Sequence, residues 1–260
     1  MDLPKFVEQS KKIQKNVLDF LENDENTEEC FQNLIQQISD QKIRDDQHQL
    51  SLFLHLLASI SNNHHHDTDF FKKIEQIIQV FKSDIKTFFS SSEILSIFKA
   101  NKRILLFFIK SDLIKIDKFI LSKFMSSKYK LYKYPEYFFT EIQNFLDEEQ
   151  KKIFDPNVDE KFDEKRMNGE NDTEICQIIR KDSLKEFITY VNQNNFSLKA
   201  KIKPSIFETN LMLLQSENIT LIEYAAFYGS IQIFQYLKQN NIQFTSNLLS
   251  FAIHGCNSEI

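Results

Sequence analysis

Apolar residues recur along most of this chain at intervals of three and four, which is the spacing of one face of an α-helix. Ser90 to Glu93 give a helix-start signal ahead of residues 94–98, and an apolar run follows at 104–109. The pattern also predicts helices over residues 4–22, 50–60, 68–82 and 135–146, and one carrying Phe31, Leu34, Ile35 and Ile38. The chain is therefore expected to be all-α.

Residues 155–172 interrupt this pattern. The segment reads DPNVDEKFDEKRMNGEND, and its Pro156 and Gly169 belong to the two residue types that most often end regular structure. We therefore expect three parts, namely a helical N-terminal domain at 1–155, a polar linker at 156–172, and a second domain at 173–260.

The second domain is organised around residues 220–237, TLIEYAAFYGSIQIFQYL. Ala225 and Ala226 allow two helices to approach closely, and Gly229 allows the positive φ that ends a helix. Ile231, Phe234 and Leu237 then form an apolar stripe on a second helix. A helix pair of this size needs a stacked neighbour, because it cannot bury its own apolar face.

The same pattern occurs twice more in this domain. Residues 182–190, DSLKEFITY, align with residues 229–237, and Ile178 and Ile179 stand where Ala225 and Ala226 stand. A third start occurs at residues 252–260, AIHGCNSEI. The offsets are 47 residues and then 27, so we expect stacked helix pairs of unequal length.

Thr-x-x-x-x-Ala-Ala-x-x-Gly, followed by Phe and Leu, resembles an ankyrin repeat. Residues 176–190, 221–237 and 252–260 are more closely similar to a divergent ankyrin-repeat family of unicellular eukaryotes, in which a helical N-terminal region precedes the repeats. The resemblance implies an ankyrin-like solenoid of stacked helix pairs with an incomplete last repeat. It also implies a non-enzymatic scaffold or adaptor for protein–protein interaction.

The resemblance further implies which residues contact a protein partner. The equivalent positions, on or beside the first helices of the pairs, are Glu223, Tyr224, Tyr228, Phe251 and His254. Packing between helix pairs is the alternative role for the aromatic residues. Leu221 and Glu223 replace the usual Pro and His of an ankyrin repeat start, and the last repeat stops at Ile260. We therefore expect a fragment of a longer array.

Composition narrows the class of protein. The 260 residues are 42% hydrophobic and 27% charged, which is globular, and only three glycines and four prolines favour helices with short turns. A net charge of −5 gives no overall nucleic-acid signature.

Cys30, Cys176 and Cys256 lie far apart, as expected of free thiols in a reducing compartment. Without a long apolar run, we expect a cytoplasmic protein with no membrane span.

One local stretch, residues 110–133, has an excess of positive charge. Its lysines alternate with phenylalanine and tyrosine, and such a mixture binds single-stranded nucleic acid or anionic lipid. The residues of this candidate patch are Lys115, Lys118, Lys123, Lys128 and Lys130. The other interpretation is a helix with lysines on its solvated face and Ile116, Phe119, Ile120 and Phe124 on its core face. We favour the second, since neighbouring acidic residues are available to pair with the lysines.

Candidate chemistry is sparse. His64, His65 and His66 are consecutive, so they cannot all face one metal ion, and no cysteine or carboxylate cluster lies near them. The sequence contains no GxSxG, HExxH, P-loop or GxGxxG pattern. We therefore expect no metal, no cofactor and no enzymatic activity.

Overall fold

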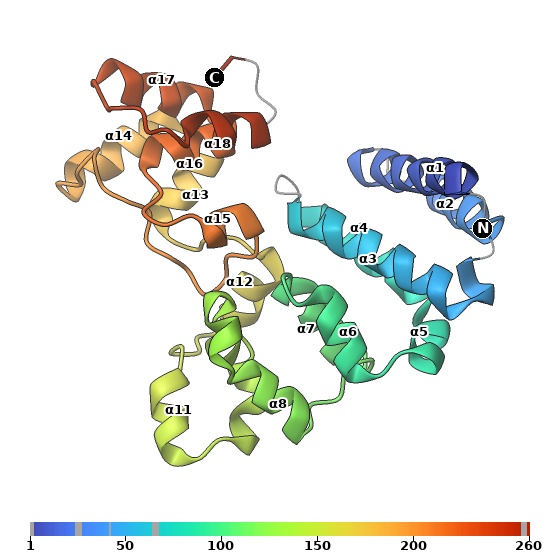
Figure 1. Ribbon diagram of the computed structural model, residues 1–260. Helices are drawn as coiled ribbons and strands as arrows, with labels where there is room; N and C mark the ends of the chain where they lie inside the picture. The colour runs from blue at the N-terminus through green and yellow to red at the C-terminus, as the bar shows by residue number, and fades with distance from the viewer. Residues whose placement is uncertain (1–2, 24–27, 42, 64–67, 256–258) are drawn as a thin grey trace. The chain divides into compact units, whose positions relative to one another are not determined.

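A computed structural model describes residues 3–23, 28–41, 43–63, 68–255 and 259–260 (Figure 1). Regular structure among these residues is helical, apart from an isolated β-bridge between Lys201 and Thr220, so the all-α prediction is confirmed. The chain forms two compact units. Unit 1 comprises Met1–Lys130 with Phe138–Phe154, and unit 2 comprises Leu131–Tyr137 with Asp155–Ile260.

Unit 1 is built from helices joined by short turns. They are α1 (Leu3–Glu22), α2 (Glu28–Ser39), η1 (Ile43–Asp45), α3 (Gln47–Asn63), α4 (Thr68–Val80), α5 (Lys82–Phe88), α6 (Ser91–Phe98), α7 (Lys102–Lys110), α8 (Lys118–Phe124), α10 (Phe139–Ile142), η3 (Gln143–Phe145) and α11 (Glu148–Phe154). Ser90 and Glu93 cap α6 with reciprocal hydrogen bonds, as their spacing predicts.

Unit 2 begins at Leu131, within the 3-10 helix η2 (Ser127–Tyr132), whose first residues belong to unit 1. Its helices are α9 (Tyr134–Tyr137), α12 (Phe162–Asn168), α13 (Glu174–Arg180), α14 (Leu184–Gln193), α15 (Leu211–Gln215), α16 (Leu221–Phe227), α17 (Ile231–Gln239) and α18 (Leu248–His254). One helix was expected over 135–146, but the chain breaks it into α9, α10 and η3.

Helices stack in pairs in both units. In unit 2, α13 and α14 form one antiparallel pair and α16 and α17 the next, and contacts join α13 to α16 and α14 to α17 (Figure 1). In unit 1, α3 with α4 and α6 with α7 repeat this arrangement, because α3 contacts α6 and α4 contacts α7. First helices therefore pack on first helices and second helices on second helices.

One buried hydrogen bond recurs at these stacked pairs. The hydroxyl of Ser230, the N-cap residue of α17, donates to the carbonyl oxygen of Ile179 in the last turn of α13 at 2.6 Å. In unit 1, Asn101 is the N-cap of α7, and its side-chain amide donates to the carbonyl oxygen of Ser61 in the last turn of α3 at 2.8 Å. Each bond ties a second helix to the first helix of the preceding pair.

A second polar contact joins the pairs of unit 2. Asp182, in the turn between α13 and α14, has a positive φ of 48°. Its carboxylate accepts hydrogen bonds from the backbone N–H groups of Gln232 and Ile233, both at 3.0 Å. These N–H groups lie in the first turn of α17, where no helical partner exists for them and where the helix dipole favours negative charge. The turn of one pair therefore caps a helix of the next.

Three of the second helices, α7, α14 and α17, end alike. Asn195 follows α14 with a φ of 47°, Asn241 follows α17 with a φ of 56°, and Asp112 follows α7 with a φ of 61°. After each, the next N–H bonds to a carbonyl five residues earlier, as in a Schellman motif. The helix pairs α6–α7, α13–α14 and α16–α17 therefore share the same ending.

Helix α16 forms the centre of the unit 2 core. All its side chains from Leu221 to Phe227 are buried, and it contacts α13, α17 and α18. The approach of α18 is close, because a Cβ atom added to Gly255 would lie 2.4 Å from the carbonyl oxygen of Ala226. Glycine at 255 and alanine at 226 thus let two helix backbones come together.

The segment expected as a polar linker, residues 156–172, is folded into unit 2. It contains α12, whose Phe162 and Arg166 are buried. The Arg166 guanidinium donates to the carbonyl oxygen of Tyr137 at 3.1 Å, and the Tyr137 hydroxyl donates to the carbonyl oxygen of Arg166 at 3.0 Å. This reciprocal pair of hydrogen bonds fixes residues 131–137 to the rest of the unit.

Replacement of Ser230 by alanine tests the bond between pairs. Loss of a buried hydrogen bond lowers stability by about 1 kcal/mol, so Ser230→Ala is expected to lower the free energy of unfolding by that amount in urea titrations. The control is Ser183→Ala, since Ser183 holds the equivalent position before α14 and makes no side-chain cap. It should change stability by less than about 0.5 kcal/mol. Equal effects of the two substitutions would contradict the assignment.

Gly255→Ala tests the close approach of α18 to α16. Helix propensity alone would favour alanine by up to about 1 kcal/mol. The clash with the Ala226 carbonyl should reverse this sign and lower stability by about 1–3 kcal/mol, as overpacking does. Thermal and urea unfolding measure the difference, with Ser250→Ala, on the exposed side of the same helix, as the control. A Gly255→Ala variant as stable as the parent would disprove the close approach.

Candidate functional site

The structure divides the five predicted partner-binding residues into two groups. Glu223, Tyr224 and Phe251 are buried, and the side chain of Tyr224 is only 1% exposed. Tyr228 and His254 are partly exposed and lie at the C-terminal ends of α16 and α18. Tyr224 is therefore packed inside unit 2, which was the alternative role for the aromatic residues. Direct contact with a partner remains open to Tyr228 and His254.

Glu223 holds the start of α16. Its carboxylate accepts from the backbone N–H of Thr220 at 2.8 Å, while its own N–H donates to the Thr220 hydroxyl oxygen at 3.3 Å. These two bonds form a capping box, which the Thr-x-x-Glu spacing signals in the sequence. The hydroxyl of Thr245 donates to the other carboxylate oxygen, so Glu223 also fixes the loop after α17.

Tyr224 belongs to a polar network around Arg180. The Arg180 guanidinium donates to the Tyr224 hydroxyl oxygen at 2.8 Å and to the carbonyl oxygen of Asn171 at 2.9 Å. Its Nε lies 2.9 Å from a carboxylate oxygen of Glu170. The guanidinium also lies over the ring of Tyr228, 5.7 Å from its centroid. The network connects α13 to α16 and to the segment before α13.

The ionisation of this network suits a structural role. Burial raises the pKa of Tyr224 and of Tyr228 well above the usual range, so both phenols stay neutral. Burial likewise raises the pKa of the Cys176 thiol to about 11, which leaves it protonated and a poor nucleophile at neutral pH. Burial disfavours the Arg180 cation, yet Tyr224 and Glu170 outweigh it and raise the pKa above the normal value.

Phe251 and His254 pack against Phe227 of α16. The Phe227 ring makes an edge contact with Phe251 at 6.2 Å between centroids and stacks on the His254 imidazole at 4.7 Å. Burial lowers the pKa of His254, so the neutral imidazole is favoured in the folded protein. These contacts attach one side of α18 to the core of unit 2.

Three apolar residues around α18 are exposed, and the sequence pattern did not single them out. Leu249 is 71% exposed and Ile253 68%, and four residues separate them, so they lie on one face of the helix. Phe244, in the loop before α18, is 54% exposed and stacks on Phe234 of α17 at 6.2 Å. Leu249 and Ile253 therefore form an exposed aliphatic pair on α18.

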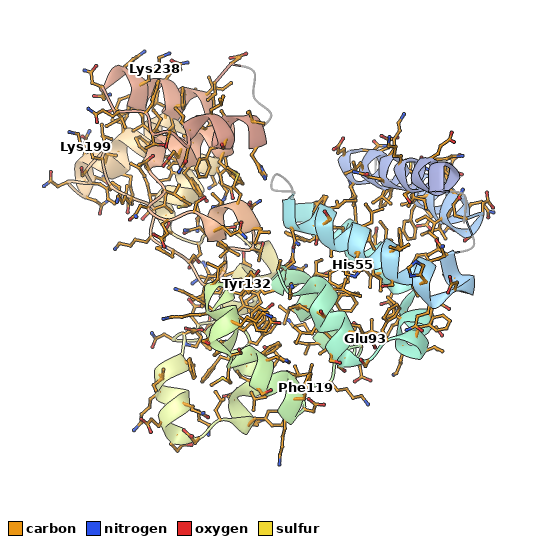
Figure 2. All side chains as sticks on the ribbon, viewed as in Figure 1. His55, Glu93, Phe119, Tyr132, Lys199 and Lys238 are labelled. Carbon is orange, nitrogen blue, oxygen red and sulfur yellow. The ribbon has the colours of Figure 1, made fainter. Side chains whose placement is uncertain are left out.

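The basic stretch of unit 1 has an exposed aromatic residue at its centre. Phe119 is 51% exposed, and the Lys123 ammonium lies 4.9 Å from the centre of its ring (Figure 2). Lys115, Lys118, Lys128 and Lys130 are exposed. Ile120 and Phe124 are buried as the core-facing interpretation requires, but Phe119 does not share their face. That interpretation is therefore wrong for Phe119.

Metal ligands do not gather in the described part of the chain. No group of three His, Cys, Asp or Glu side chains there has the geometry to hold an ion, and residues 64–66 lie outside the described residues. None of the helices described is both long enough and apolar enough to cross a membrane. Cys30 and Cys176 form no disulfide among the described residues, and Cys256 lies outside them.

Comparison with known proteins returned no match to a family model, to a curated protein or to a solved structure.

Proposed function

We propose that this chain is a cytoplasmic, non-enzymatic scaffold or adaptor that binds a protein partner on an ankyrin-like stack of helix pairs. The main support is the repeated packing of first helix on first helix and second on second, in both units. The recurring bond from a second-helix N-cap to the preceding first helix supports the same architecture. Stacks of this kind present extended surfaces without requiring a catalytic pocket.

The polar network around Arg180 also supports a scaffold. At neutral pH it offers two neutral phenols, a protonated thiol and a guanidinium already bound to Glu170 and Tyr224. These groups stabilise packing, and none of the four is poised as a base or a nucleophile. The residues of the network hold the surface in place and leave partner contact to the exposed side chains around them.

The surface proposed for the partner lies on the loops that follow the second helices. These loops lie beside the start of α16 at Thr220, at the opposite end of that helix from Tyr228. The loop after α14 exposes Lys199 and Lys203, and Lys199 projects from the unit in Figure 2. The outer side of the second helices exposes Lys185 on α14 and Lys238 on α17. Both pairs of lysines carry the same positive charge, so the pair on the second helices is the control for the pair in the loop.

Charge reversal distinguishes these surfaces. The double variant Lys199→Glu with Lys203→Glu should lose at least about tenfold in the recovery of a specific partner, because like charges at a recognition surface oppose binding. The matched variant Lys185→Glu with Lys238→Glu should retain it. Affinity capture of the tagged chain from its native cell, quantified by mass spectrometry, measures the recovery. The proposal fails if no protein is enriched, or if both variants recover the same set equally.

A second candidate function is binding of single-stranded nucleic acid by the basic stretch of unit 1. The specific observation is the exposure of Phe119, with Lys123 over its ring and four further exposed lysines nearby in sequence. An exposed ring stacks on a base, and the lysines pair with phosphates. The interpretation that placed Phe119 on the core face of its helix did not allow this arrangement.

Phe119→Ala tests this candidate. Stacking on an aromatic side chain contributes about 1–3 kcal/mol per base, so affinity for a labelled oligothymidine should fall at least about fivefold in fluorescence anisotropy. Affinity of the parent chain should also fall steeply between low and moderate salt. Phe145→Ala is the control, because Phe145 is equally exposed in the same unit. No binding at low salt, or an equal loss in the control, would exclude the site.

A further inference from the structure

Unit 1 contains a groove of about 560 Å³ that the proposed function does not use. Its floor is one face of α4, whose residues there recur at helical spacing and include Lys72, Glu75, Gln76 and Gln79. Helix α2 adds Glu28 and Phe31 to the lining, and α7 adds Phe107. The two phenylalanine rings are partly exposed and give the groove apolar walls. A volume of this size is typical of a binding pocket.

Two carboxamides on the floor are available for hydrogen bonding. Gln76 and Gln79 are exposed, and neither side chain bonds to another group among the described residues. Each carboxamide carries an acceptor oxygen and two N–H donors. The carbonyl and N–H groups of an extended peptide match this set, whereas a helix already pairs its own backbone groups. The floor therefore suits an extended segment better than a helix.

The charged groups of the groove are not all paired. The Lys72 ammonium lies 2.6 Å from a carboxylate oxygen of Asp69, so its charge is matched by a neighbour on α4. The carboxylate of Glu75 accepts from the guanidinium of Arg103, which is buried beneath it in unit 1. Glu28 is the third charged residue of the lining, and its negative charge is left over.

Glu28 and Phe31 together form a place for a cationic side chain. They lie three residues apart on α2 and so share one face of that helix. The Glu28 carboxylate accepts from the neutral carboxamide of Gln32 at 2.6 Å, and no cation among the described residues pairs with it. A lysine or arginine at this point gains a charge partner, and its aliphatic stem lies against the Phe31 ring. The same charge repels anionic ligands such as nucleic acid.

The length of the floor sets the length of the ligand. Lys72 and Val80, which both line the groove, are eight residues apart, so the floor is about 12 Å long. About four residues of extended chain cover that distance. We propose that this groove binds a short extended segment of a partner protein, with a lysine or arginine beside Glu28 and the peptide backbone on Gln76 and Gln79. The groove belongs to unit 1, so the proposal does not depend on the loops of unit 2.

A positional-scanning library of hexapeptides with blocked ends tests the proposal on the full chain. Peptides with lysine or arginine fixed at one position should bind at least about fivefold more strongly than those with glutamate there, because only the first are complementary in charge. The best arginine peptide is then titrated in fluorescence anisotropy. Gln76→Ala with Gln79→Ala should weaken its binding at least about fivefold through the loss of two hydrogen bonds. Both residues are exposed, so the urea midpoint should stay unchanged.

Charge recognition is tested separately. Glu28→Gln should weaken binding of the arginine peptide about fivefold and leave unchanged the binding of a peptide with norleucine in place of arginine. Glu29→Gln is the control, since Glu29 is exposed in the same turn and is not among the residues that line the groove. Gln36→Ala with Gln37→Ala, both exposed on α2, is the control for the carboxamides. The proposal is overturned if no hexapeptide binds saturably, if glutamate peptides bind as well as arginine peptides, or if the control variants lose as much as the groove variants.

Discussion

The stack depends on a hydrogen bond buried between successive helix pairs. Ser230 donates it to α13 in unit 2, and Asn101 donates it to α3 in unit 1. A short helix leaves N–H and carbonyl groups without partners at its ends, and burying them unpaired is costly. Each of these bonds satisfies a carbonyl group in the last turn of the preceding first helix and fixes the spacing of the stack. Asn101 also accepts from the Ile104 N–H of its own helix, whereas Asp182 provides the cap of α17. Apolar packing alone would not fix that spacing, because it is not directional.

Around this bond, three further polar contacts hold elements of unit 2 together. Asp182 caps α17 from the preceding turn, Glu223 joins α16 to Thr245, and Arg180 joins α13 to Tyr224. Burial keeps the phenols of Tyr224 and Tyr228 and the Cys176 thiol protonated. The polar side chains of this core thus hold its helices together. Exposed side chains of unit 2 include Lys199 and Lys203 in the loop after α14, and Leu249 and Ile253 on α18.

Much of the local structure was readable from the sequence. The spacing of Ile231, Phe234 and Leu237 identified α17, Ser90 and Glu93 marked the start of α6, and Gly229 has the positive φ of 65° expected at its turn. The roles of the candidate site residues were harder to predict from the sequence. Glu223 and Tyr224 occupy positions where the resemblance implies partner contact, yet one caps a helix and the other bonds to Arg180, 44 residues away. The Thr-x-x-Glu spacing signalled the first role, and no local signal existed for the second.

The sequence by itself determined that this protein is helical and where most helices begin, because periodicity and capping act over a few residues. It also identified the related helix pairs of the C-terminal region. Only the tertiary structure decided which faces are covered. Phe119 shares a helix with the buried Ile120 and Phe124 yet is exposed, and Leu249 and Ile253 are exposed although their counterparts in α13 and α16 are buried. Periodicity shows which residues lie on one face, whereas burial depends on whether another helix packs against that face.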